Sequence, residues 1–211
     1  MGRENAHEMG HLRLRSGRME AFSDGVFAIA ITLLVLEIAV PPSSEADLLG
    51  ALLREWPSYL AYLVSFSTIG AIWLGHAHLT EFLSEVSPGF LRLNLILLLF
   101  VGFLPFPTHL LAENMSSRDA ERVAVTLYGV VLLVIALSLS ALWRFALVEN
   151  LVRRDPDDED IQLLTRRLTP GLALYLAFIL VGLFLPTVAV FGYMLVAIGL
   201  LIPTRAKRRR G

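Results

Sequence analysis

The feature that most constrains this chain is the mostly apolar stretch at residues 22–40, FSDGVFAIAITLLVLEIAV. As an α-helix it would extend about 28 Å at 1.5 Å per residue, close to the ~30 Å hydrocarbon thickness of a bilayer. The stretch also contains Ser23, Asp24 and Glu37. Ionisable residues inside a spanning helix are costly enough to indicate a functional site. The pattern therefore predicts a membrane helix with a role beyond anchoring the chain.

An apolar face runs along this predicted helix. With successive residues 100° apart, five positions fall within an arc of about 80°. Ser23 and Asp24 point away from that arc, towards neighbouring helices. Such a face is either ordinary helix packing or the lining of a narrow conduit, and periodicity alone favours packing. The residues of the arc are Phe22, Gly25, Ile29, Thr32 and Leu36.

Composition indicates an integral membrane protein. Hydrophobic residues make up 55% of the 211 positions, and the mean hydropathy is +0.65, far above the value for a water-soluble domain of this size. The chain has no cysteine. Disulfides, thiolate metal sites and cysteine nucleophiles are therefore excluded.

Further apolar runs predict five more spans. The third run closes at the sequence FLPFPT, whose prolines we take to mark its exit from the membrane. Pro186 divides the last apolar region into two short helices or kinks one long helix. Including the first, the predicted spans are residues 22–40, 56–79, 90–111, 123–147, 168–185 and 188–202.

The distribution of basic residues favours six spans. With both termini cytoplasmic, all of the 18 Lys and Arg residues except Arg54, Arg118 and Arg122 lie inside. Five spans would place the basic tail, residues 203–211, outside, against the positive-inside rule. The predicted fold is therefore an all-α membrane protein with six transmembrane helices, both termini cytoplasmic, forming one domain over residues 1–211. The acidic residues at 155–160 fall in a cytoplasmic loop and are interpreted as solvated.

This topology brings polar residues of the first three spans to one cytoplasmic layer. We expect a cluster that gives a buried Asp24 carboxylate the hydrogen-bond partners it needs in lipid. The cluster is either a gate or proton-sensing network, or a structural clasp between helices, and the direction of Asp24 favours the clasp. Its members are Arg18, Ser23, Asp24, Trp73, His76 and Asn94.

These residues carry a family resemblance. The sequence RMEAFSDG at residues 18–25, its continuation VFAIAITLLVLEI, Trp73, His76, Asn94 and FLPFPT at residues 103–108 resemble the bacterial branch of the transmembrane protein 175 family of lysosomal potassium channels. The resemblance implies a potassium-preferring cation channel whose first helix lines a pore through Ile29, Thr32 and Leu36. Because this chain has one Phe-Ser-Asp motif, it implies a homotetramer in a bacterial plasma membrane. K⁺ would be the permeant ion, with no cofactor.

Ordinary potassium channels use a Thr-Val-Gly-Tyr-Gly filter, which this sequence lacks. Selectivity through rings of Ile29 and Leu36 would come from the cost of dehydrating the ion, and it should be modest. The Thr32 hydroxyl would replace part of the water shell. Glu37 would either concentrate cations at the outer mouth or reach headgroup water at the membrane interface.

The sequence also allows two other functional classes to be considered: a proton-coupled membrane protein and an enzyme. A proton-coupled transporter or proton-conducting protein would use Asp24, Glu37 and His76 as a relay, although the first helix shows no break at the membrane midplane. An enzyme is not expected, because His76 and His78 are two residues apart and cannot face each other on a helix to form a metal pair. The basic tail is expected to bind anionic lipid headgroups rather than nucleic acid.

Overall fold

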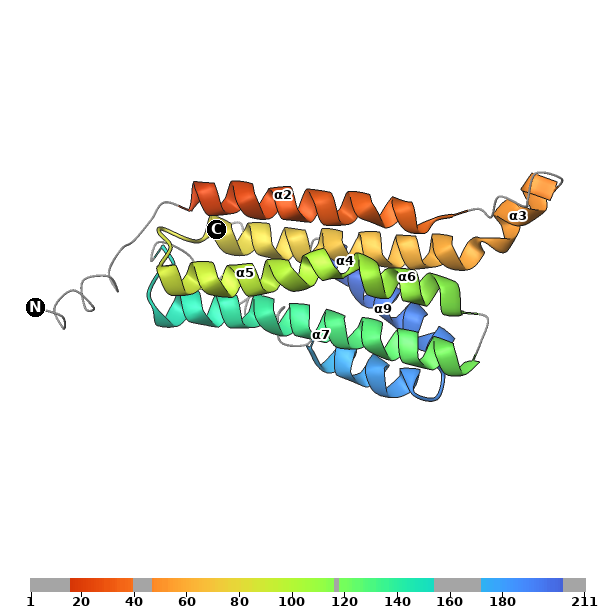
Figure 1. Cartoon of the computed structure of the whole chain (residues 1–211). Helices are drawn as coiled ribbons and strands as arrows, with labels where there is room; N and C mark the ends of the chain where they lie inside the picture. The colour runs from red at the N-terminus through yellow and green to blue at the C-terminus, as the bar shows by residue number, and fades with distance from the viewer. Residues whose placement is uncertain (1–15, 40–46, 116–117, 154–171, 203–211) are drawn as a thin grey trace, which may run out of the picture.

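The computed structural model describes residues 16–39, 47–115, 118–153 and 172–202 (Figure 1). Within these ranges the regular structure is helical, apart from one isolated antiparallel bridge between Leu83 and Val152. Among the described residues, four helical segments are long and apolar enough to cross a membrane, and two further apolar helices are shorter. The predicted basic tail and the acidic loop at 155–160 lie outside the described residues.

The first span consists of α2 (Gly17–Leu33) followed by the 3₁₀ helix η2 (Leu34–Glu37). Ile38 then takes extended backbone angles, with φ −91° and ψ 96°. The helix therefore ends before Pro41, and its last turn is tightened to three residues per turn.

The second span is α4 (Trp56–Glu81), which is preceded by the short helix α3 (Leu48–Arg54). The Asp47 side chain caps α3, because its Oδ1 accepts a hydrogen bond of 3.0 Å from the Gly50 backbone N–H. Pro57 lies in the first turn of α4, where no helical hydrogen bond is lost. The Asp47 cap therefore fixes the start of α3, and Pro57 fixes the start of α4.

The third span is divided into α5 (Pro88–Phe103) and α6 (Pro105–Asn114). The Leu104 backbone N–H bonds to the Val101 carbonyl at 3.2 Å, and the chain continues directly into α6. The expectation that the prolines mark the exit was wrong. Proline is tolerated in the first turn of a helix, so Pro105 begins a new helix where the old one stops.

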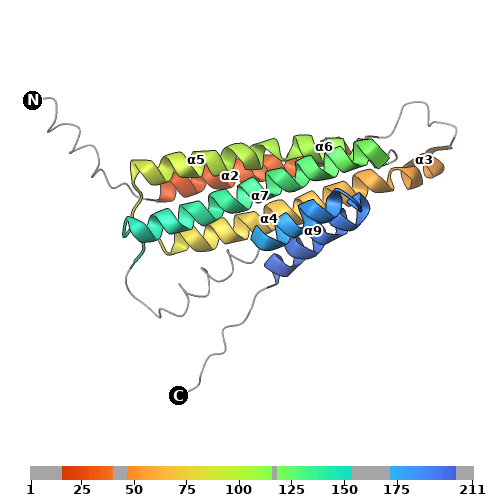
Figure 2. The same cartoon turned by 90° about the horizontal axis from the view of Figure 1, so that it is seen from below.

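The fourth span, α7 (Arg118–Val148), is followed by Asn150, whose φ of 53° is left-handed. The Leu151 N–H then bonds to the Ala146 carbonyl at 2.9 Å, which closes the helix end. The helix Leu172–Gly182 and α9 (Pro186–Leu201) follow. Figures 1 and 2 show these two shorter helices side by side along part of the bundle, with α9 against α4 and α7.

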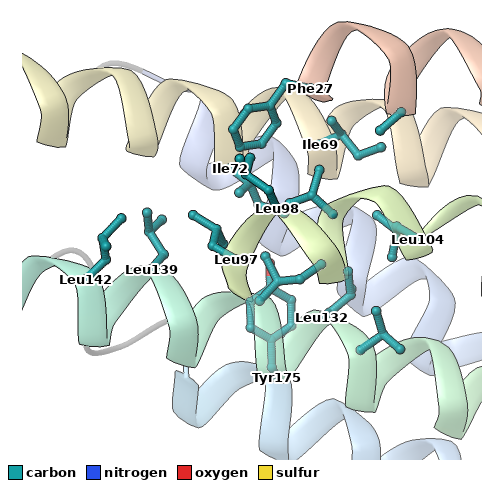
Figure 3. Close-up of a cluster of buried hydrophobic side chains, with 14 of the residues drawn as sticks. Phe27, Ile69, Ile72, Leu97, Leu98, Leu104, Leu132, Leu139, Leu142 and Tyr175 are labelled. Carbon is teal, nitrogen blue, oxygen red and sulfur yellow. The ribbon is translucent and has the colours of Figure 1, made fainter. Parts of the chain in front are cut away.

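The core joins all the long helices, as Figure 3 shows for Phe27, Ile69, Leu98 and Leu132. Coverage by the chain itself is uneven. In the most apolar part of each span, 28% of the α2 residues are buried, against 39–44% in the other three. The first helix lies at the edge of the bundle in Figure 1. Much of its surface is therefore left for lipid or for another protein chain.

Candidate pore face and polar network

The arc predicted from the sequence lies on the uncovered side of α2. The exposed fractions are 56% for Phe22, 62% for Ile29 and 71% for Leu36, whereas Phe27 and Leu34 on the opposite side are 3% and 0% exposed. Thr32 and Gly25 are also exposed. The single chain therefore presents one continuous, mostly apolar face.

Thr32 is the polar residue in the middle of this face. Its Oγ1 lies 2.9 Å from each of the Ala28 and Ile29 carbonyl oxygens, to which it donates. Because the hydroxyl proton is used within the helix, the oxygen lone pairs remain available on the exposed side. Thr32 thus presents an electron-rich oxygen on the exposed face.

A buried chain of hydrogen bonds ties the first three spans together. The Asn94 amide Nδ2 donates to Ser23 Oγ at 2.9 Å, and Asn94 Oδ1 lies 2.9 Å from His76 Nε2. Ser23 in turn donates to the Met19 carbonyl at 2.8 Å. Ser23, His76 and Asn94 are 0%, 1% and 1% exposed. Buried polar groups with satisfied partners fix the relative positions of the helices that carry them.

Asp24 belongs to a separate contact. Its Oδ1 accepts a hydrogen bond of 2.9 Å from Trp73 Nε1, and both side chains are exposed. The expectation of a buried carboxylate was wrong, because α2 lies at the edge of the bundle and Asp24 is on its uncovered flank. Arg18 is exposed and forms no hydrogen bond or ion pair with another residue that the structure describes. The six predicted residues therefore form a buried triad (Ser23, His76 and Asn94) and a surface pair (Asp24 and Trp73), and Arg18 belongs to neither.

Glu37 ends η2 and contacts a residue that sequence reasoning did not select. Its Oε2 lies 2.6 Å from His109 Nδ1, and Glu113 Oε2 lies 3.3 Å from His109 Nε2. The direction of the chain could have indicated this contact, because the first and third spans run the same way and residue 109 lies near the end of the third. Within the described ranges, no group of three or more His, Cys, Asp or Glu residues is arranged to hold a metal ion.

These features define a multi-span helical membrane protein whose first helix is joined to its neighbours by the buried triad and is uncovered along one face. The model of the family described as endosomal/lysosomal potassium channel TMEM175 matches residues 18–105. A potassium channel from Chamaesiphon minutus is 43% identical over 165 residues, covering 76% of this chain and 81% of that protein. The chain therefore belongs to the TMEM175 family, which confirms the resemblance noted in its sequence.

The fold agrees with a solved structure of the same family. The crystal structure of a lysosomal potassium-selective channel TMEM175 homolog from Chamaesiphon minutus matches with a TM-score of 0.80 at 38% identity, over 88% of this chain and 96% of that chain. The chicken endosomal/lysosomal proton channel TMEM175 is 36% identical over 146 residues, covering 65% of this chain but 29% of the longer relative. Membership of an ion-channel family confirms the expectation that the chain is not an enzyme.

Proposed function

We propose that this chain is a potassium-preferring cation channel that conducts through a narrow apolar pore between the first helices of four copies. Its bacterial relative is named a potassium channel, and the plasma membrane of a bacterium is the proposed location. The observation that carries the proposal is the uncovered face of α2. Ile29 and Leu36, 62% and 71% exposed, stand on either side of Thr32.

A central axis accounts for this face better than lipid does. A helix that faces only hydrocarbon gains nothing from a hydroxyl oxygen, yet Thr32 presents one midway along the face. Gly25, on the same face, has nothing within 4 Å of an added Cβ, so copies of α2 can approach closely there. In the proposed assembly, rings of Ile29 and Leu36 narrow the path. K⁺ loses its water shell at a lower cost than Na⁺, so this path favours K⁺. The preference is modest, because dehydration cost alone sets it, without a carbonyl filter.

The polar contacts have a supporting role in this proposal. The buried triad of Ser23, His76 and Asn94 acts as a clasp that holds α2 in one rotation, with Ile29 towards the axis. Each copy forms one domain of six membrane helices, in which Leu172–Gly182 and α9 are the fifth and sixth. Both termini are cytoplasmic, and the basic tail at 203–211 meets anionic headgroups.

Ion flux through vesicles containing the purified protein tests the pore assignment. We expect Ile29→Ser and Leu36→Ser to raise K⁺ flux or to weaken the preference for K⁺ over Na⁺, because each removes an aliphatic ring from the path. Leu99→Ser is the matched control, since Leu99 is 66% exposed on α5. Wild-type flux and ion preference in both α2 variants would remove this face from the pore.

Proton conduction is the second candidate, because the chicken relative is named a proton channel. A relay through Asp24, His76 and Glu37 is less favoured by the geometry. Asp24 bonds to Trp73 and His76 to Asn94 in separate contacts, and Glu37 lies at the other end of the span. Acidification of K⁺-free vesicles that is abolished by both Asp24→Asn and His76→Gln would favour this candidate.

A further inference from the structure

A histidine lies between two carboxylates at the end of the span opposite the buried triad. His109 and Glu113 are one turn apart on α6, and Glu37 closes η2. The distances are 2.6 Å from His109 Nδ1 to Glu37 Oε2 and 3.3 Å from His109 Nε2 to Glu113 Oε2. The Glu37 side chain is 23% exposed and that of His109 is 42% exposed. The Glu37 carboxylate is therefore held mainly by its contact with α6.

The 3₁₀ turn determines where Glu37 points. Three residues per turn place Glu37 directly over Leu34, which is 0% exposed. A continued α-helix would turn Glu37 about 60° closer to the exposed arc. Leu36, at 71% exposed, stays on the open face. The sequence thus places a carboxylate next to the uncovered face but turned away from it.

The number of protons on the His109 ring decides whether its contacts with Glu37 and Glu113 are attractive. A carboxylate oxygen is an acceptor, and an unprotonated imidazole nitrogen is also an acceptor. Within the described part of the chain His109 Nδ1 makes no aligned hydrogen bond, so its contact with Glu37 is an ion pair that depends on the charge of the ring. The imidazolium form attracts both Glu37 and Glu113, and loss of one proton removes that attraction. The cluster then changes from a net charge of −1 to −2.

Other charged groups at this end have partners of their own. Glu55, before α4, accepts a hydrogen bond from Ser58, and on α7 Glu121 accepts one from Thr187. Arg122 lies 3.9 Å from Asp119 on the same helix. The other acidic, basic and histidine side chains described on α2, α4, α5 and α7 lie towards the opposite ends of these helices by their positions in the chain: Arg18, Glu20, Asp24, His76, His78, Glu81, Arg92 and Arg144.

We infer that His109 is a positioning residue for ion entry, which holds the Glu37 carboxylate on α6 when protonated and releases it when neutral. The inference rests on the proposed pore. Release adds one uncompensated negative charge per copy beside the Leu36 ring, which raises the local cation concentration. Four such charges roughly 10 Å from the axis would increase K⁺ entry about threefold at ~0.1 M ionic strength, and by more at lower ionic strength.

The test uses the full chain in planar bilayers at ~0.1 M ionic strength, with the pH changed on one side at a time. For wild type we expect K⁺ current to rise about threefold as the pH on the Glu37 side increases from 5 to 8. His109→Gln should give the high current at both pH values, because it never carries charge. Glu37→Gln should give a lower current and a smaller pH response, because His109 still changes charge beside Glu113 but no carboxylate is released next to the Leu36 ring. His78→Gln, an exposed histidine at the other end of α4, is the matched control and should keep the wild-type profile.

A wild-type pH profile in His109→Gln, or in His109→Asn if the glutamine variant does not fold, would overturn this inference. A pH response of full wild-type size in Glu37→Gln would also overturn it. The pore proposal is tested separately in the same bilayers with Ile29→Ser and Leu36→Ser. If those variants change the current while His109→Gln keeps the pH response, the pore stands and the positioning role fails. If neither serine variant changes the current, the pore itself fails.

Discussion

Replacing Asn94 with alanine removes the middle member of the buried triad, and we expect a loss of about 1–3 kcal/mol in the free energy of unfolding. Asn94 is 1% exposed and makes two contacts of 2.9 Å, with Ser23 and His76 on different helices. Hydrogen bonds between membrane helices average about 0.6 kcal/mol and reach about 1.7 kcal/mol. Two of them give the expected range.

A double-mutant cycle separates the Asn94–Ser23 bond from the volume lost in each single substitution. We expect Ser23→Ala and Asn94→Ala to show a coupling energy of about 0.6–1.7 kcal/mol. Unfolding in mixed micelles, followed by circular dichroism, gives the free energies. Asn114→Ala is the control, because the Asn114 amide donates to the Leu110 carbonyl of its own helix at 2.8 Å and makes no hydrogen bond to another helix among the described residues. Coupling below about 0.3 kcal/mol in a folded set of variants would refute the clasp.

Two further predictions concern stability alone. Asp24→Asn should keep the thermal midpoint of the detergent-solubilised protein, since the amide oxygen can still accept a hydrogen bond from Trp73 Nε1. Asp24→Ala should lower the midpoint by a few degrees, because that hydrogen bond is lost. Equal losses in both variants would contradict a stabilising role for the Asp24–Trp73 hydrogen bond. Gly129→Ala should destabilise the protein by about 1–3 kcal/mol, because the new Cβ would overlap the Tyr193 hydroxyl and lie 2.8 Å from Ile179 Cγ1. Gly102→Ala, with nothing within 4 Å, should not, and similar unfolding curves for the two variants would show that the core yields at Gly129.

Lipid explains why so much of the fold follows from the sequence. A chain in hydrocarbon must satisfy its backbone within helices, so apolar runs give the positions of α2, α4 and α7 directly. The same regularity predicts faces. Steps of 100° along α2 group Ile29 with Leu36, and these residues are exposed together in the structure.

Features that depend on neighbouring helices were not predictable in this way. The burial of Asp24 was misjudged because it depends on how much of α2 the other helices cover, which no local pattern records. The 3₁₀ turn at Leu34–Glu37 has no signal in an apolar run, yet it decides the direction of Glu37. Pro105 was taken as a stop, although a proline that ends one helix also suits the start of the next.

His109 shows a different limit. In the sequence it is one of five histidines without a motif, and its spacing to Glu37 means nothing until both are placed at one end of the bundle. The contact with Glu113 does follow from the i,i+4 spacing on α6. The pair of His109 and Glu37 could have been predicted by comparing the depths of the two residues in the membrane, but not from a motif.

The central claim, that the open face of α2 lines the pore, is tested most directly by thiol modification. The chain has no cysteine, so Ile29→Cys and Leu36→Cys each provide a single target. Leu63→Cys on α4 and Leu99→Cys on α5 are controls of similar exposure, 55% and 66%. A water-soluble, permanently charged methanethiosulfonate reagent applied during K⁺ conduction should block current irreversibly in both α2 variants and in neither control. Unchanged current in Ile29→Cys and Leu36→Cys, with their thiols as unreactive as those of the controls, would contradict the account.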